Sequence, residues 1–236
     1  MSGPEQIVLV VGGSRGLGLG FVKQLAQTPA TRAIGTLRKP APNLEKELPH
    51  AKFLLMDMTD DASVVAAAAQ VPELDVLVIN GAFGARDPVT STSTATLQTY
   101  LETNVLGPHR VINAFLPALR ARKTRKIVVI ASSSASLAFQ AEPTSGGLAG
   151  SYGVSKAALN MLVVQIAKEL NRPPANEAFT VVPIHPGWVA TDMGNQHGPG
   201  GQDPQEAAKK ILELVDKLES KDSATFYKFD GTTMPW

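Results

Sequence analysis

Short apolar runs rich in β-branched residues alternate with longer amphipathic stretches along the whole chain. This alternation is typical of a parallel sheet with helices on both faces, because each parallel strand needs a crossover that passes over the sheet. The predicted strands are Gln6–Val11, Arg32–Leu37, Lys52–Met56, Asp75–Asn80, Lys126–Ser132, Phe179–Ile184 and Thr225–Phe229. The predicted helices are Gly16–Gln27, Asp60–Gln70, Ala95–Asn104, Val105–Arg122, Ser151–Asn171 and Pro204–Lys221. We therefore expect an α/β fold with a seven-stranded, doubly wound parallel sheet.

The 236 residues are predicted to form one domain, 1–236, since α/β folds of this size commonly share a single core. Two stretches break the alternation of strands and helices, at 133–150 and 185–203. Both are long for connections in such a fold. We interpret them as loops that contact a substrate.

Composition excludes several classes of function. Lys and Arg total 22 against 21 Asp and Glu, so no excess positive charge favours nucleic acid or an anionic membrane. Cysteine is absent, which excludes disulfides and thiolate chemistry and agrees with a cytoplasmic protein. The first apolar run is too short to cross a membrane, and no basic segment precedes it. The histidines lack the close spacing of metal ligands, so no metal site is predicted.

The first predicted strand runs directly into a glycine-rich turn, Gly12-Gly13-Ser14-Arg15-Gly16-Leu17-Gly18, and a helical pattern follows at once. Glycines let the backbone approach a pyrophosphate closely, and the unpaired N–H groups of a helix start favour its negative charge. The turn therefore predicts a nucleotide site in a Rossmann-type domain, although a tight turn without a ligand is the alternative. The residues expected to contact a cofactor here are Gly12, Ser14, Arg15, Gly16, Leu17 and Gly18.

The residue that follows the second predicted strand should face the adenosine ribose, and it is Arg38. A carboxylate there would accept from a free 2′-hydroxyl, whereas a guanidinium pairs with a 2′-phosphate. Arg38, assisted by Arg15, therefore favours NADP(H); the alternative is that Arg38 and Lys39 only solvate a loop. Asp57 is expected to accept from the adenine amino group, or else to help start the next helix.

Tyr152 and Lys156 are four residues apart in a long predicted helix, so their side chains should share one face. A free phenol, with a pKa of about 10, holds its proton too tightly for ready exchange near neutral pH. A nearby ammonium stabilises phenolate, so we expect Lys156 to lower the pKa of Tyr152 and make it a proton-transfer group. The pair alone carries little weight, since this spacing arises by chance in many helices.

Together, the glycine turn and the Tyr-x-x-x-Lys step resemble those of the short-chain dehydrogenase/reductase family, classical type, over essentially the whole chain. Val11 stands where the family has a threonine, and Ile79-Asn80-Gly81-Ala82 where it has Asn-Asn-Ala-Gly. The segments His185–Met193 and Phe229–Trp236 look most like a subgroup of sniffer-type carbonyl reductases, C-factor-like proteins and fungal polyketide ketoreductases.

The resemblance implies roles for further residues. Asn104 would hold a water linked to Lys156, an ordinary cap or helix break being the alternative. Ser132, rather than Ser133, would hold a substrate carbonyl oxygen beside Tyr152. The implied cofactor contacts beyond the turn are Arg38, Asp57, Met58, Asn80, Gly81, Tyr152, Lys156, Pro186, Gly187, Val189 and Thr191.

The activity that the resemblance implies is the reduction of a ketone or aldehyde to an alcohol by NADPH, with Tyr152 as proton donor. The expected partner is a small carbonyl or alcohol substrate, and a second copy in a homodimer or homotetramer is a further candidate. Two alternatives stay open. One is a non-redox cyclase or isomerase, and the other is a catalytically silent NADP-binding regulator, suggested by Val11 and the altered segment Ile79–Ala82.

Overall fold

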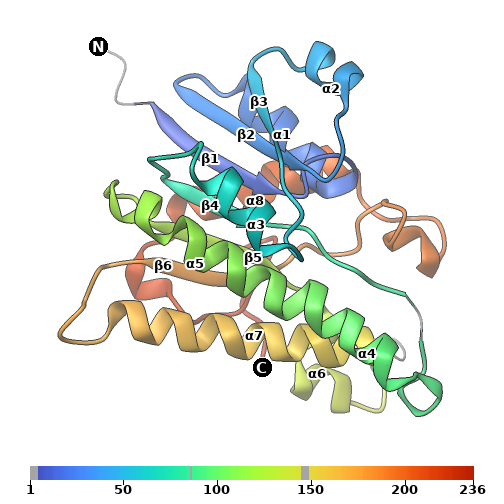
Figure 1. The fold of residues 1–236 in the computed structure, drawn as a ribbon. Coiled ribbons are helices and arrows are strands. Elements are labelled where there is room, and N and C mark those ends of the chain that lie inside the picture. The colour runs from blue at the N-terminus through green and yellow to red at the C-terminus, as the bar shows by residue number, and fades with distance from the viewer. Residues whose placement is uncertain (1–4, 86, 145–148) are drawn as a thin grey trace.

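Seven parallel strands form one sheet at the centre of the computed structural model, which describes residues 5–85, 87–144 and 149–236 (Figure 1). The strands are β1 (Gln6–Val11), β2 (Thr31–Leu37), β3 (Ala51–Leu55), β4 (Val76–Ile79), β5 (Lys126–Ile130), β6 (Thr180–His185) and β7 (Tyr227–Lys228). Their order in space is β3-β2-β1-β4-β5-β6-β7, and every neighbouring pair is parallel. The chain winds outward from β1 in one direction and from β4 in the other, which confirms the predicted doubly wound fold.

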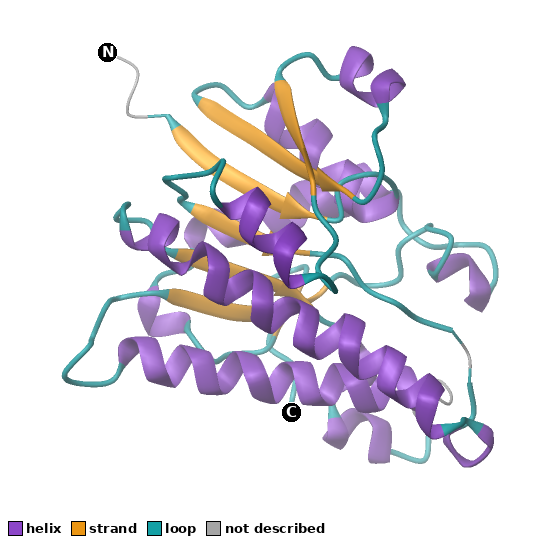
Figure 2. Cartoon of the chain, viewed as in Figure 1, coloured by secondary structure: helices purple, strands orange, loops and turns teal. Residues whose placement is uncertain are grey.

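Helices cover both faces of this sheet (Figure 2). On one face lie α1 (Gly16–Gln27) and α8 (Pro204–Lys217), which pack against each other. The other face carries α3 (Asp61–Ala68), α5 (Gly107–Arg120) and α7 (Gly150–Asn171). In Figure 1, α5 and α7 run across the front of the sheet. The sheet is therefore the middle of three layers.

The alternation of side chains along β1 divides the core into two apolar clusters. Ile7, Leu9 and Val11 belong to the cluster under α3, α5 and α7, whereas Val8 and Val10 belong to the cluster under α1 and α8. Successive side chains of a strand point to opposite faces, so a central strand must be apolar at every position. This requirement explains the continuous apolar runs in the sequence.

Two short helices in the structure have no counterpart in the sequence prediction. The first is α2 (Pro42–Glu47), which buries none of its residues and so leaves no apolar period to detect. The second is α6 (Leu137–Ala141), which lies inside the predicted substrate loop 133–150 and begins where Ser136 Oγ accepts from the Phe139 N–H. Residues 145–148 of that loop lie outside the described residues.

The predicted division between two helices at Asn104 and Val105 is wrong. A π-helix at Glu102–Leu106 joins α4 (Thr94–Leu101) to α5, so the chain continues as one helix without a break. The wider turn has an i→i+5 hydrogen bond from the Gly107 N–H to the Glu102 carbonyl. Asn104 lies within this turn and is 1% exposed.

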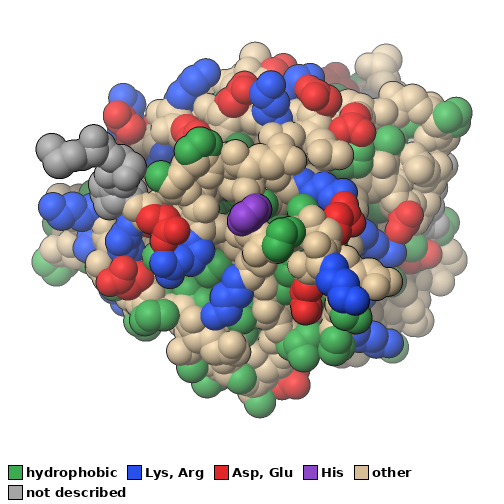
Figure 3. All heavy atoms as spheres, turned by 90° about the horizontal axis from the view of Figure 1, so that it is seen from above, with side chains coloured by type: hydrophobic (Ala, Val, Ile, Leu, Met, Phe, Trp, Pro, Cys, Tyr) green, Lys and Arg blue, Asp and Glu red, His purple; other side chains and the backbone are tan. Residues whose placement is uncertain are grey.

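Charges of both signs are mixed on the face of the molecule seen in Figure 3. On the face seen in Figure 3, Lys and Arg side chains lie among Asp and Glu side chains rather than in a patch of one sign. Close ion pairs such as Lys23–Glu47 (2.7 Å) and Arg32–Glu5 (2.6 Å) have the same mixed character. Among the residues that the structure describes, no helix combines the length and apolarity needed to cross a bilayer.

Asp75 ties β1 to the segment that enters β4. Its Oδ2 accepts a hydrogen bond from the backbone N–H of Ile7 at 2.9 Å, and Arg122 pairs with the same oxygen at 3.0 Å. Burial raises the pKa of the Asp75 carboxyl, but the hydrogen bonds from Arg122 and Ile7 outweigh it, so the pKa lies below its usual value. The carboxylate is therefore ionised and fully engaged in the native state.

We expect Asp75→Ala to lower the free energy of unfolding by about 3 kcal/mol, because Ile7 loses its acceptor and Arg122 its buried partner. Urea unfolding followed by circular dichroism measures the loss. Glu73→Ala is the matched control: Glu73 pairs with the same guanidinium from a half-exposed position, and its removal should cost at most about 1 kcal/mol. Equal losses from the two variants would contradict the special role of Asp75.

Candidate active site

The glycine turn lies between β1 and α1, at the point where the winding of the sheet reverses. Gly12 has a φ of +80°, in the left-handed region that favours glycine. At Gly18, a Cβ would lie 2.0 Å from the Gly12 carbonyl oxygen and 2.6 Å from Nδ2 of Asn80. The first turn of α1 can therefore lie this close to the ends of β1 and β4 only because residue 18 is a glycine.

Side chains from both neighbouring strands brace this turn. In β2, Thr36 Oγ1 accepts from the Gly12 N–H at 3.0 Å and the Thr36 carbonyl accepts from the Gly13 N–H at 2.9 Å. After β4, Asn80 Nδ2 donates to the Gly12 carbonyl at 3.2 Å. Val11 stands at the position of the threonine in the pattern that the sequence resembles, and it has no hydroxyl. The buried Thr36 of β2 provides a hydroxyl that binds the turn instead.

The two arginines expected at the adenosine end have different surroundings. Arg15 Nη1 lies 2.7 Å from Asp192 Oδ2, with side chains 74% and 77% exposed. Such an exposed ion pair contributes little to stability. Arg15 can therefore leave Asp192 at little cost and pair with another anion. Arg38 is exposed directly after β2, and its charge is one of the influences that lower the pKa of Asp57, after the backbone hydrogen bond from Thr59. Arg38 and Asp57 therefore belong to one region.

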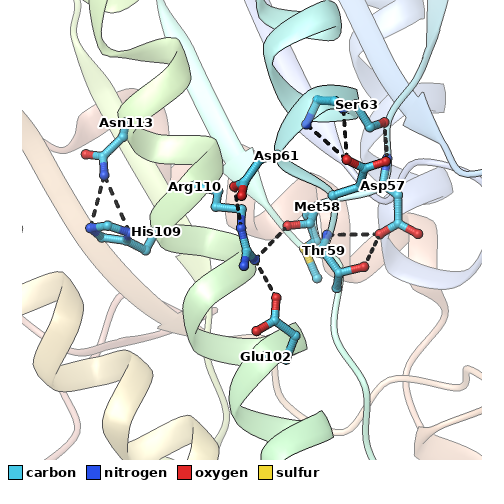
Figure 4. Close-up of polar contacts among 11 residues, drawn as sticks. Asp57, Met58, Thr59, Asp61, Ser63, Glu102, His109, Arg110 and Asn113 are labelled. Carbon is cyan, nitrogen blue, oxygen red and sulfur yellow. Dashed lines mark hydrogen bonds and ion pairs between the residues drawn. The ribbon is translucent and has the colours of Figure 1, made fainter.

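Asp57 does not start the following helix. Its Oδ1 accepts from the N–H and the hydroxyl of Thr59, at 2.9 and 2.8 Å (Figure 4). The cap of α3 is Asp60, whose Oδ1 accepts from the Ala62 N–H at 2.9 Å. Asp57 is therefore not the cap of α3, although its carboxylate orders the turn that precedes it, and its expected contact with adenine stays a prediction.

Met58 is held in place from the helical layer. Arg110 Nη1 lies 3.5 Å from the Met58 carbonyl oxygen, and the same guanidinium pairs with Asp61 and Glu102 at 2.6 Å each (Figure 4). The Met58 side chain packs beside Gly81, where a Cβ would lie 3.3 Å from its Cε. Since Met58 is only 9% exposed, little of its side chain is open to a ligand.

Tyr152, Lys156 and Ser132 come together at the carboxyl ends of the central strands. Tyr152 and Lys156 share a face of α7, with Lys156 Nζ 5.7 Å from the centre of the Tyr152 ring. The Ser132 hydroxyl lies close enough to the Tyr152 phenol to lower its pKa, and its oxygen accepts from the Ser134 N–H at 3.2 Å. Of the two candidate serines, Ser132 is thus the one whose hydroxyl meets the phenol.

The electrostatics of this group differ from the prediction. Burial raises the pKa of Tyr152 to about 12, and the hydrogen bond with Ser132 opposes this only in part. Burial also lowers the pKa of Lys156 to about 8. Lys156 Nζ donates to the Ile130 carbonyl at 2.8 Å, so the expectation that it makes the phenol acidic is wrong for this arrangement. The phenol keeps its proton at neutral pH, as a proton donor requires.

Asn104 acts as a clamp. Its Oδ1 accepts from the Phe83 N–H at 2.8 Å, and its Nδ2 donates to the Phe83 carbonyl at 2.8 Å and to Ser155 Oγ at 2.9 Å. The side chain therefore joins the segment after β4 to α7, and both of its amide hydrogens are used. A water linked to Lys156 would therefore have to donate to an oxygen of Asn104.

The segment after β6 lies beside the glycine turn. The Pro186 carbonyl accepts from Gln202 Nε2 at 2.8 Å, and Gly187 adopts a φ of +76°. Val189 is 6% exposed, so only its backbone is available to a cofactor. The methyl group of Thr191 approaches Gly16, where a Cβ would lie 3.0 Å from it. The segment predicted to hold the nicotinamide thus lies beside the turn predicted to hold the pyrophosphate.

Sequence reasoning assigned Asn80 and Gly81 to the site but missed the part of the segment after β4 that begins at Phe83. At Gly84, a Cβ would meet the side chain of Met193 at 3.0 Å and the ring of Tyr152 at 3.1 Å. The Tyr100 hydroxyl holds this segment, accepting from the Ala85 N–H at 3.0 Å and donating to Asp87 Oδ2 at 2.5 Å. The glycine at position 84 could have indicated this contact from the sequence, since a glycine allows a close approach that any side chain would block.

The fold and the glycine turn define an α/β protein of the Rossmann type, and comparison with known proteins identifies its family. Residues 6–200 match the family model described as short chain dehydrogenase. An uncharacterized oxidoreductase of Schizosaccharomyces pombe is 32% identical over 100% of both chains. The chain therefore belongs to the short-chain dehydrogenase/reductase family of oxidoreductases.

Two solved structures are similar over nearly their whole lengths. The NADPH-bound carbonyl reductase from chicken fatty liver is 28% identical with a TM-score of 0.86, covering 100% of this chain and 96% of that one. The carbonyl reductase Sniffer of D. melanogaster is 27% identical with a TM-score of 0.84, covering 99% and 100%.

We expect Thr36→Val to lower the free energy of unfolding by about 1 to 2 kcal/mol, because the partly buried Gly12 N–H loses its acceptor while the side-chain shape is nearly kept. The same change should weaken binding of NADPH, which fluorescence titration measures. Thr36→Ser is the control, since it keeps the hydroxyl and should stay close to the parent in binding. If the Val variant bound NADPH as tightly as the Ser variant, the hydroxyl would not brace the turn.

Proposed function

We propose that this protein is an NADPH-dependent carbonyl reductase that converts a ketone or aldehyde to an alcohol. The observation that carries the proposal is that Ser132, Tyr152 and Lys156 lie close together, with a phenol that keeps its proton beside a serine hydroxyl. Membership of an oxidoreductase family supports it, as do the two similar structures whose proteins are carbonyl reductases.

The residues present fit a dinucleotide. The turn from Gly12 to Gly18 has no room for side chains where it packs, and its backbone precedes a helix start that favours phosphate. Arg38, with Arg15 when it leaves Asp192, would hold a 2′-phosphate. The segment Pro186–Thr191 would hold the nicotinamide end. When bound, NADPH supplies the hydride for the carbonyl carbon.

The protein's own residues position the carbonyl oxygen and supply the proton. The hydroxyls of Ser132 and Tyr152 would both donate to the substrate oxygen, which polarises the carbonyl. Tyr152 then donates its proton, and because its pKa is raised to about 12 that proton is present throughout the neutral range. Lys156 would hold the ribose next to the nicotinamide. Asn104 keeps the segment after β4 fixed beside this group.

We expect Tyr152→Phe to lower kcat for carbonyl reduction by about 10³-fold or more, because it removes the proton donor and keeps the ring. The loss of reduced-nicotinamide absorbance in the presence of ketones, aldehydes and quinones measures the rate. The Kd for NADPH, from fluorescence titration, should change by less than about twofold.

Tyr227→Phe is the matched control, since it removes a hydroxyl from the edge strand β7 and should leave the rate unchanged. A parent-like rate from Tyr152→Phe would contradict the mechanism. Absence of any carbonyl-dependent oxidation of NADPH in the parent would favour a non-redox enzyme or a silent regulator instead.

We expect Arg38→Ala to reduce kcat/KM with NADPH by about 10- to 100-fold and to leave kcat/KM with NADH nearly unchanged, since a charge-assisted hydrogen bond to the 2′-phosphate is lost. Parallel assays with both cofactors give the ratio. Lys39→Ala, at the next position, is the control for a general loss of positive charge. An equal effect from the two variants would mean that both residues only solvate the loop.

A further inference from the structure

His185 lies where two segments of the proposed site meet. It is the last residue of β6 and directly precedes Pro186 and Gly187. Its Nδ1 accepts a hydrogen bond from the backbone N–H of Ser133 at 3.1 Å. The imidazole thus connects the segment with the Ser132 hydroxyl to the segment expected to hold the nicotinamide.

A side chain is needed here because the β5–β6 ladder ends at Pro186. The last rung is the bond from the Ala131 N–H to the Ile184 carbonyl, at 2.8 Å. In a parallel ladder the next N–H, that of Ser133, would donate to the carbonyl of Pro186. That carbonyl accepts from Gln202 instead, and Pro186 has no N–H to donate in return. The imidazole nitrogen therefore takes the place of a strand carbonyl.

The imidazole must be neutral to do this. A ring nitrogen accepts a hydrogen bond only when it carries no proton, so the proton lies on Nε2. Burial lowers the pKa of His185 to about 4, the charge of Lys228 acts in the same direction, and Asp230 opposes them. Nδ1 is therefore an acceptor at neutral and mildly acidic pH.

We propose that His185 is a positioning residue: by holding the peptide between Ser132 and Ser133, it keeps the Ser132 hydroxyl directed at the Tyr152 phenol. Ser132 itself has extended backbone, with φ −159° and ψ 153°. Its direction depends on the Ser134 N–H bound to its hydroxyl and on the anchored peptide that follows it. This inference rests on the proposed function, since the direction of Ser132 affects catalysis only if its hydroxyl holds a substrate oxygen.

A pair of substitutions separates this role from packing. In His185→Asn the amide oxygen can occupy the place of Nδ1, whereas in His185→Gln it lies one carbon farther out, near the place of Nε2. We expect the Asn variant to keep kcat within about threefold and the Gln variant to lose about 10- to 100-fold, because small misplacements of a substrate-orienting group have effects of this size. The Kd for NADPH should stay within about twofold in both.

The primary isotope effect on kcat with 4-deuterated NADPH should rise in the Gln variant, because the misplaced carbonyl slows hydride transfer itself. A variant that is merely less stable would keep the parent isotope effect. Equal turnover and equal isotope effects for the Asn and Gln variants would overturn the inference.

Hydrogen exchange at the Ser133 amide gives a readout that needs no turnover. In the protein without cofactor, the Ser133 N–H should stay protected in the Asn variant and exchange at least about tenfold faster in the Gln variant. If the parent reduces no carbonyl, the proposed function fails while this bond is still tested. If the Gln variant does not fold, a folded Asn variant that loses both Ser133 protection and turnover would contradict the inference.

Discussion

The close contact of the first turn of α1 with the ends of β1 and β4 is the constraint on which the rest of this structure depends. Gly18 leaves no space for a Cβ between the Gly12 carbonyl and the Asn80 amide. This contact sets how the first turn of α1 lies on the sheet. Thr36 and Asn80 hold the turn from the two strands that flank β1. A side chain at Gly18 would change the helix position and the proposed nucleotide site together.

The sequence was sufficient to predict the strands of the sheet, because burial on both faces demands apolar residues at every position, as along Ile7–Val11. It was also sufficient for the shared face of Tyr152 and Lys156, since helix geometry sets the four-residue step. It was not sufficient for α2, which buries nothing, or for the π-helix at Glu102–Leu106, whose register depends on packing against other segments. Local patterns carry no information about either.

The protonation of Tyr152 shows why a motif alone does not give electrostatics. A neighbouring ammonium lowers the pKa of a phenol, but removal from water raises it, and the balance depends on where each group points. Lys156 points to the Ile130 carbonyl, and desolvation prevails. The spacing of the two residues is the same in either case. The burial of the phenol, which depends on segments distant in sequence, is the larger influence here.

The segments around the proposed site share one structural device: a side chain binds a backbone group where the regular ladder ends. Thr36 does so for Gly12, Asn104 for Phe83 and His185 for Ser133, across separations of 24, 21 and 52 residues. A loop without ladder partners would otherwise leave these N–H groups unpaired and its own course undetermined. Because each bond joins segments that are far apart in the chain, no local pattern predicts it. The strands set where the site lies, and these three side chains set the direction in which its loops leave them.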